Sequence, residues 1–211
     1  MRVLVDNDVI YKGCSYGLIV DLLGSMALSL NDAGVLASVR YVILPRLRKL
    51  FNQNGAAELF DSLLEQVIEI EPTKDEQLFA AELEYQAQVR QIALDSGESL
   101  LISVLISRQV PVLLTGDKKA VIALEQLLDE DPRLNPIIGK VLCLEQLLLS
   151  LLKDGDYIEV QNAICAASAA DKAISICFGC VSGGATKDSC LQGLDSYVGN
   201  LRAAAGRILV P

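Results

Sequence analysis

Short apolar runs alternate with longer stretches of helical pattern through the first 152 residues of this chain of 211. The runs suited to strands are Arg2–Val5, Ser38–Leu44, Val67–Ile70, Val110–Leu114 and Lys140–Cys143. The stretches suited to helices are Tyr16–Leu30, Pro45–Phe51, Ala56–Gln66, a helix capped by Thr73 that runs to Gln91, Ser96–Arg108, Lys118–Leu128 and Leu144–Leu152. Such alternation favours a parallel sheet with helices on both faces, joined by right-handed crossovers. The sequence therefore predicts an α/β fold built on a doubly wound parallel sheet.

The chain changes character after residue 152. Residues 153–156, Lys-Asp-Gly-Asp, interrupt the pattern, and the remainder is rich in Ala, Ser and Gly. We expect the helices Ile158–Val181 and Lys187–Ala205 to form a hairpin around Gly183 and Gly184. The chain is thus divided into an α/β domain over residues 1–152 and a helical C-terminal extension over residues 153–211. Such an extension could associate with a second copy of the chain or with another protein.

Composition limits the chemistry that this chain can carry out. It contains no histidine, which excludes Ser-His-Asp and Cys-His catalysis and zinc held by histidine. Its formal net charge of −9 and its pI near 4.6 argue against binding nucleic acid by bulk attraction. Carboxylates and thiols remain as the main groups for chemistry, and a nucleic-acid partner would need a local basic patch.

The sequence predicts neither a membrane span nor an export signal. Its longest apolar stretches, 141–152 and 163–181, are interrupted by charged residues before they reach the roughly 20 residues that a span needs. Met1 and Arg2 lead straight into a strand-like segment, without a separate apolar stretch and cleavage site. We therefore expect a cytoplasmic protein whose six cysteines are thiols.

Four of the cysteines lie in the extension, at positions 165, 177, 180 and 190. Four thiolates can close a tetrahedral zinc site, but the spacing here is irregular. Two of these cysteines also fall into one apolar stripe with Ile164, Ile174 and Val181. The pattern favours cysteines that pack as small apolar residues, with a zinc site as the alternative.

Two acids follow closely on predicted strands. Asp6 comes directly after Val3-Leu4-Val5, and Asp117 follows Leu114 across the short turn Thr115-Gly116. Ligands of open parallel sheets bind beyond the C-terminal ends of the strands, so two acids there predict a site. If the two strands are neighbours, the carboxylates share one crevice and repel each other unless a cation or a proton intervenes. The alternative role of each acid is to cap the helix that follows it.

Glu98 is the third candidate. On its predicted helix it shares a face with Leu101, Ile102 and Leu105. A carboxylate at the head of an apolar stripe needs a partner. A local partner is available, because the spacing from Asp95 to Glu98 is that of a capping box. Capping and metal binding are compatible roles for this side chain.

The three acids together predict a divalent-metal site. Oxygen ligands select a hard cation, Mg²⁺ or Mn²⁺, held by few carboxylates and several waters. Such an ion could activate water for in-line attack on a phosphodiester, and this chemistry requires no histidine. We expect Asp6, Glu98 and Asp117 to hold the ion.

Three segments of the chain resemble, in order, the three acidic motifs of PIN domains. They are VLVDNDVI at residues 3–10, LDSGES at residues 94–99 and LLTGDKK at residues 113–119. The resemblance covers roughly residues 1–152 and rests on the order and spacing of motifs that are each weak alone.

The resemblance implies a three-layer α/β/α fold of strand order 3-2-1-4-5 and metal-dependent cleavage of RNA. It gives Asp6, Glu98 and Asp117 the metal-binding and catalytic roles. PIN domains include RNA-processing enzymes and toxins of bacterial toxin–antitoxin pairs, so the partners that it implies are RNA and an antitoxin-like protein.

The chain departs from the family at one motif. PIN domains usually carry another acid near the start of the helix after strand 2, and residues 42–49 contain none. Asp8 or Asp95 could replace it as a metal ligand. Alternatively, Arg46 neutralises the site, and the protein is a non-catalytic relative that binds RNA or another protein. The basic residues predicted to contact RNA are Arg46, Arg48, Lys49, Lys118 and Lys119.

A phosphatase is the remaining alternative. Asp6-Asn7-Asp8-Val9 also resembles the first motif of haloacid-dehalogenase-type phosphatases, in which the first Asp is a nucleophile and the second an acid/base. Thr115 would then stand for the second motif of that family. The family usually follows its first motif with a tight helical turn and a hairpin flap, whereas residues 16–30 are predicted to form one helix. The pattern therefore favours the PIN domain.

Overall fold

The computed structural model describes residues 1–50, 55–181 and 183–211 of the chain. They form an α/β fold around a five-stranded sheet in which all neighbouring strands are parallel. The strands are β1 (Val3–Val5), β2 (Ala33–Leu36), β3 (Ile68–Ile70), β4 (Val112–Thr115) and β5 (Val141–Cys143), in the spatial order β3-β2-β1-β4-β5. The predicted α/β class and parallel sheet are confirmed, and the strand order is the expected 3-2-1-4-5.

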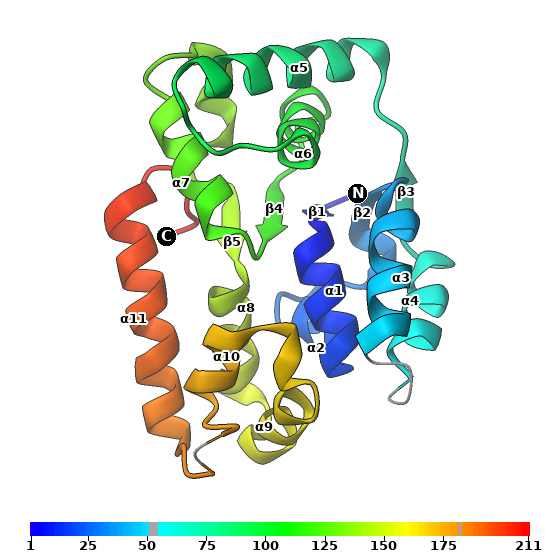
Figure 1. Cartoon of the computed structure of the whole chain (residues 1–211), viewed down its shortest axis with the longest axis vertical. Coiled ribbons are helices and arrows are strands. Elements are labelled where there is room, and N and C mark those ends of the chain that lie inside the picture. The colour runs from blue at the N-terminus through cyan, green and yellow to red at the C-terminus, as the bar shows by residue number, and fades with distance from the viewer. Residues whose placement is uncertain (51–54, 182) are drawn as a thin grey trace.

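Helices connect the strands and surround the sheet (Figure 1). They are α1 (Asn7–Tyr16), α2 (Ile19–Gly24), α3 (Val39–Leu50), α4 (Ala56–Leu64), α5 (Lys74–Val89), α6 (Ser96–Ser107), α7 (Lys118–Leu127), α8 (Leu144–Asp154), α9 (Tyr157–Ala166), α10 (Lys172–Cys177) and α11 (Lys187–Ala205). The six helices predicted to begin at or next to positions 56, 73, 96, 118, 144 and 187 are confirmed. In the described ranges, no helix combines the length and the apolar character of a membrane span.

The alternation of side chains along the strands divides the core into two layers. Val3 and Val5 of β1 belong to one hydrophobic cluster, together with side chains of α1–α4 and α8–α10. Leu4 belongs to the other cluster, with side chains of α5, α6 and α7. The three residues of β1 are almost completely buried, as expected for the central strand of a parallel sheet. Helices therefore cover both faces of the sheet.

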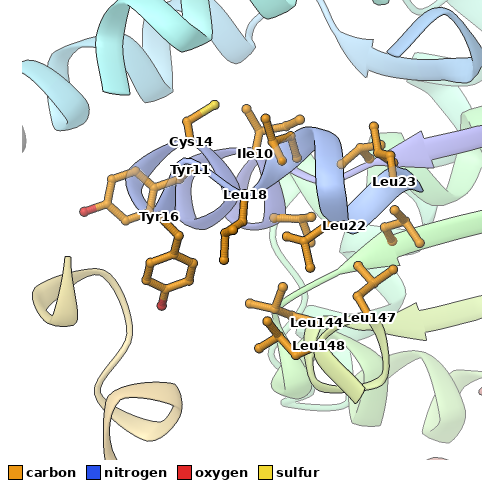
Figure 2. Close-up of a cluster of buried hydrophobic side chains, with 14 of the residues drawn as sticks. Ile10, Tyr11, Cys14, Tyr16, Leu18, Leu22, Leu23, Leu144, Leu147 and Leu148 are labelled. Carbon is orange, nitrogen blue, oxygen red and sulfur yellow. The ribbon is translucent and has the colours of Figure 1, made fainter. Parts of the chain in front are cut away.

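Helix α1 lies inside the molecule rather than on its surface. Its residues from Val9 to Tyr16 are all buried, although they include Lys12 and Ser15. Figure 2 shows side chains of α1 and α2 beside the leucines of α8, and all of them belong to one buried cluster. Burial along this helix therefore includes polar side chains, which a surface helix would turn to solvent.

The structure corrects the predicted N-terminal helix. Instead of a single helix over Tyr16–Leu30, there are two helices: α1 begins directly after Asp6 and ends at Tyr16, and α2 follows. A 3-10 turn at residues 30–32 then leads into β2. Gly17 adopts the left-handed backbone conformation, with φ of 70°, that commonly ends a helix. The prediction was wrong because it ran one helix across the turn at Gly17 that separates α1 from α2.

The second strand lies earlier than predicted. β2 is Ala33–Leu36, and the predicted strand Ser38–Leu44 is wrong, since those residues begin α3 or belong to it. Val39, Ile43 and Leu47 recur every four residues and are buried together on one face of α3, which outweighs the preference of β-branched residues for strands. Pro45 lies inside α3 rather than in a first turn. Phe51, the expected end of that helix, lies outside the described residues.

The C-terminal segment is broken where one helix was predicted. The range Ile158–Val181 contains most of α9, a 3-10 turn at residues 168–170 and α10, so the prediction of one continuous helix is wrong. Helix α11 packs against α7 and α8, and Leu209 beyond it forms a parallel bridge with Val141 of β5. The division at residue 152 stays a prediction, although residues on both sides of it share the two hydrophobic clusters.

Cys165 and Cys180 form a disulfide, which corrects the prediction that all six cysteines are thiols. The break between α9 and α10 turns the chain back on itself and brings the two Cα atoms to 4.9 Å. Four other cysteines, at positions 14, 143, 177 and 190, are free and buried. Cys177 and Cys190 are the two of these that lie in the extension, and for them the prediction of apolar packing is confirmed. The alternative of a zinc site with four thiolates is incompatible with the intact disulfide.

Removing this disulfide should destabilise the protein. It joins residues 15 positions apart, so Cys165→Ser combined with Cys180→Ser should lower the free energy of unfolding by about 3 kcal/mol through loss of the constraint on the unfolded chain. Urea unfolding of the oxidised wild type and of the double variant measures the difference. Wild type treated with a dithiol reductant should match the variant, and an unchanged midpoint after reduction would contradict this role.

Candidate functional site

The pairing of β1 with β4 brings two predicted acids to one edge of the sheet. The strands are parallel, with Val5 opposite Leu114. The N–H of Asp6 donates to the carbonyl oxygen of Leu114 over 2.9 Å, and the hydroxyl of Thr115 donates to Oδ2 of Asp6, also over 2.9 Å. Asp6 and Asp117 therefore follow adjacent strand ends, which is the arrangement that a shared site requires.

The carboxyl group of Asp6 is buried and does not cap the helix after it. Asp6 occupies the N-cap position of α1, but its side chain makes no capping hydrogen bond, so the capping alternative is wrong for this residue. Burial raises the pKa of Asp6 to about 6 against the lowering effect of the hydrogen bond from Thr115. The negative charges of Asp8 and Asp117 add to the rise.

Glu98, in the first turn of α6, lies beside the same pocket as Asp6. The predicted capping box is present, since Oε2 of Glu98 accepts from the N–H of Asp95 over 2.8 Å and Oδ1 of Asp95 accepts from the N–H of Glu98 over 2.8 Å. A small, mostly apolar pocket between α6 and α7 lies beside Glu98 and Asp6. Burial raises the pKa of Glu98 to about 7, and the charges of Asp95, Asp117 and Asp6 contribute to that rise.

Asp117 caps α7 with one of its two oxygens. Its Oδ1 accepts from the N–H groups of Lys119 and Ala120 over 2.8 and 3.1 Å, so the capping alternative is confirmed for this residue. The other oxygens, Oδ2 of Asp117 and Oε1 of Glu98, accept no hydrogen bond from the residues that the structure describes. One oxygen of each acid thus fixes the side chain, and the other remains for a ligand.

The three acids border one open cleft of about 570 Å³ at the C-terminal edge of the sheet. They come from the ends of two strands and from the first turn of α6. The side chains and backbone that line this acidic cleft belong to Asp6, Asn7, Asp8, Leu36, Ser38, Val42, Arg46, Asp95, Ser96, Gly97, Glu98, Leu100 and Asp117. The structure therefore places all five predicted acids around the same cleft.

The donor groups of the acidic cleft suit a hard cation held partly by water. Carboxylate oxygens are the ligands that Mg²⁺ and Mn²⁺ prefer. Two of the acids have raised pKa values, and a cation between them would relieve the repulsion that contributes to the rise. Within the described ranges, no three Asp, Glu or Cys side chains are grouped closely enough to hold a metal ion together. The acids would therefore hold a cation through water molecules or after moving closer to one another.

Asp8, a predicted substitute ligand, is paired with a buried lysine. Nζ of Lys12 lies 2.5 Å from Oδ2 of Asp8 and 2.6 Å from Oδ2 of Asp171. The two carboxylates raise the pKa of Lys12 although its burial acts in the opposite direction. Sequence reasoning missed Lys12, even though its i,i+4 spacing from Asp8 was a usable signal. Asp171 lies in the C-terminal segment, and nothing in the sequence around it indicates a contact with Lys12.

The predicted RNA-binding residues occupy different surroundings. The guanidinium group of Arg46 borders the acidic cleft and lies 4.0 Å from the centre of the Tyr11 ring. Nζ of Lys118 pairs with the buried Glu145 over 2.5 Å and therefore ties α7 to α8. The other three, Arg48, Lys49 and Lys119, are exposed. Of the five predicted basic residues, Arg46 is the one that lines the cleft.

No protein-family model, curated protein or solved structure matches this chain. The fold and the site define its class instead. It is an α/β protein with a five-stranded parallel sheet and an acidic cleft beyond the C-terminal ends of β1 and β4.

The raised pKa of Glu98 predicts that the metal-free protein loses stability as the pH rises. The pKa in the folded protein is about 7, above the ordinary value of 4.5, so the native state binds the proton more tightly than the unfolded chain. The stability that Glu98 gains from binding its proton more tightly in the native state is fully present below about pH 4.5, and it is lost as the pH rises through 7. Between these limits the wild type should lose about 2 kcal/mol relative to Glu98→Gln, a value discounted for partial exposure.

Urea unfolding in EDTA at about pH 4.5 and pH 7.5 measures this difference. Gln can still form the capping box, so Glu98→Gln isolates the charge. Glu84→Gln, on the exposed surface of α5, is the matched control and should follow the wild type at both pH values. Equal losses in wild type and Glu98→Gln would contradict the prediction.

Proposed function

We propose that this protein is a metal-dependent ribonuclease of the PIN type, in which Asp6, Glu98 and Asp117 hold Mg²⁺ or Mn²⁺. The observation that carries the proposal is that these three acids line one open cleft. Helix capping accounts for Asp117 and for one oxygen of Glu98, but it does not account for the buried carboxyl group of Asp6. The raised pKa values of Asp6 and Glu98 support a site that is completed by a cation.

Each acid would have a definite part in the reaction. Thr115 orients Asp6, and the backbone N–H groups of α7 orient Asp117, so both carboxylates are held in fixed positions at the cleft. A bound divalent cation would supply the positive charge that activates water and stabilises the leaving oxygen of a phosphodiester. Glu98 would bind the cation through Oε1, since its Oε2 accepts the hydrogen bond from the N–H of Asp95.

Arg46 would bind the phosphodiester backbone of RNA. Its guanidinium group lies over the ring of Tyr11, which restricts its position, and it borders the same cleft as the acids. A guanidinium group matches the geometry of a phosphate with two parallel donors. A positive charge inside the cleft can offset part of the repulsion between RNA and a protein of net charge −9.

The second candidate is a non-catalytic RNA-binding relative of PIN domains. Arg46 favours it, because this residue brings a positive charge to the cleft near the motif where the family usually has an acid. The pairing of Asp8 with Lys12 also favours the non-catalytic candidate. The charge of Asp8 is then partly neutralised, so Asp8 is a weaker metal ligand in place of the missing acid. The two candidates share RNA binding and differ in whether bound RNA is cleaved.

A cytoplasmic location is part of this proposal, and it has a consequence for the disulfide. Disulfides persist in oxidising compartments and are uncommon in the cytoplasm, where thiol reductants act on them. In a cytoplasmic protein these reductants would open the disulfide between Cys165 and Cys180 to two thiols, whereas an intact disulfide in the cell would contradict the cytoplasmic location. Alkylation of intact cells followed by mass spectrometry of the two cysteines distinguishes these forms.

Neutralising either Asp6 or Asp117 should strongly lower the rate of RNA cleavage. Asp6→Asn and Asp117→Asn should each lower the rate of cleavage of a single-stranded RNA in Mn²⁺ by at least about 100-fold, because each removes a charge that holds the cation. Asn still caps a helix, so Asp117→Asn leaves the start of α7 intact. The measurement is single-turnover cleavage in Mn²⁺ and in EDTA.

Asp156→Asn is the matched control for these variants. Asp156 caps α9 through two backbone N–H groups, just as Asp117 caps α7, but it does not line the acidic cleft. It should cleave RNA at the wild-type rate. Equal rates in all variants and in EDTA would end the nuclease proposal, whereas RNA binding without cleavage would favour the second candidate.

Arg46 should contribute to RNA binding more than to the chemical step. Arg46→Gln should raise KM about tenfold with a smaller change in kcat, because it removes a charge-assisted contact with the RNA backbone. Arg40→Gln is the control, since Arg40 lies on the same helix but pairs with Glu69 over 3.6 Å. Equal KM values for wild type and Arg46→Gln would exclude this role for Arg46.

A further inference from the structure

A series of charged contacts joins the C-terminal segment to the acidic cleft. Lys12 lies between Asp171 and Asp8, with its Nζ atom 2.6 and 2.5 Å from their Oδ2 atoms. The side chains of Lys12 and Asp171 are 10% and 16% exposed, so solvent screens this pair only weakly. Asp8 is itself one of the residues that line the cleft.

The same contacts reach the turn that carries Asp117. A Cβ atom added to Gly116 would lie 2.1 Å from Oδ2 of Asp8 and 3.3 Å from Nζ of Lys12. The carboxylate and the ammonium group therefore lie against the backbone between β4 and α7, and glycine permits this close approach. A change in the position of Lys12 would act on Asp8 and on the turn before Asp117.

Asp171 is itself fixed by the structure around it. Its Oδ1 accepts from the N–H groups of Ala173 and Ile174 over 2.8 and 3.0 Å and caps α10, which leaves Oδ2 for Lys12. The segment that carries Asp171 is closed by the disulfide between Cys165 and Cys180. The carboxylate of Asp171 is thus held in place by its own segment, independently of its contact with Lys12.

We propose that Asp171 is a positioning residue of the acidic cleft, which sets the affinity of the cleft for a divalent cation by sharing Lys12 with Asp8. This inference rests on the proposed metal site. Lys12, Asp8 and Asp171 together carry one negative charge. If Asp171 is neutralised, that charge is lost, the ammonium group pairs with Asp8 alone, and its positive charge opposes a cation in the cleft.

The test measures the affinity of the full oxidised chain for Mn²⁺ by titration calorimetry. Asp171→Asn should bind Mn²⁺ about tenfold more weakly than the wild type, while Asn preserves the cap of α10. Asp156→Asn is the matched control, because Asp156 caps α9 in the same segment through two N–H groups and makes no ion pair among the described residues. The control should bind Mn²⁺ as tightly as the wild type.

A double variant separates the electrostatic role from a merely structural one. Lys12→Met combined with Asp171→Asn has no ammonium group beside Asp8, so it should bind Mn²⁺ at least as tightly as the wild type. If the double variant binds as weakly as Asp171→Asn alone, the loss comes from damage to the packing and the inference is overturned. Circular dichroism melting of each variant establishes that it is folded.

The remaining outcomes distinguish this inference from the proposed function. The wild type could bind Mn²⁺ tightly, with binding abolished by Asp117→Asn and unchanged by Asp171→Asn. This outcome would overturn the role of Asp171 and support the metal site. Absence of Mn²⁺ binding by the wild type would remove the metal site, and the inference with it.

Discussion

The parallel pairing of β1 with β4 is the interaction on which the site depends. It places Val5 opposite Leu114, so that Asp6 and Thr115 meet through a hydrogen bond and Asp117 begins the helix beside them. Neither strand is long, and both are held by burial in the two apolar layers. A change that shifted this register by one residue would send the strand side chains to the opposite layers and separate the acids.

Burial of charge sets the character of the cleft. The apolar surroundings of Asp6 and Glu98 raise their pKa values, and the neighbouring acids add to the effect. At the edge of the cleft, the buried Lys12 offsets part of this negative charge, because it pairs with both Asp8 and Asp171. The C-terminal segment thus contributes to the electrostatics of the cleft as well as to the hydrophobic core.

Local patterns in the sequence were sufficient to predict part of the fold. Thr73 and Asp95 begin capping boxes, so the starts of α5 and α6 could be read directly from the chain. The start of α1 could not, because Asp6 at its N-cap position makes no capping hydrogen bond and no capping box marks the helix. β2 was missed because the β-branched residues after it pack as one face of α3.

The sequence by itself determined which groups are available for chemistry and where they stand relative to the strands: carboxylates without histidine, with Asp6 and Asp117 at strand ends. These are local properties of the chain. Only the tertiary structure decided that Asp117 uses one oxygen as a cap, that Arg46 borders the cleft while Lys118 does not, and that Asp171 reaches Lys12. Such contacts depend on how distant segments pack together, and no local pattern of residues encodes that packing.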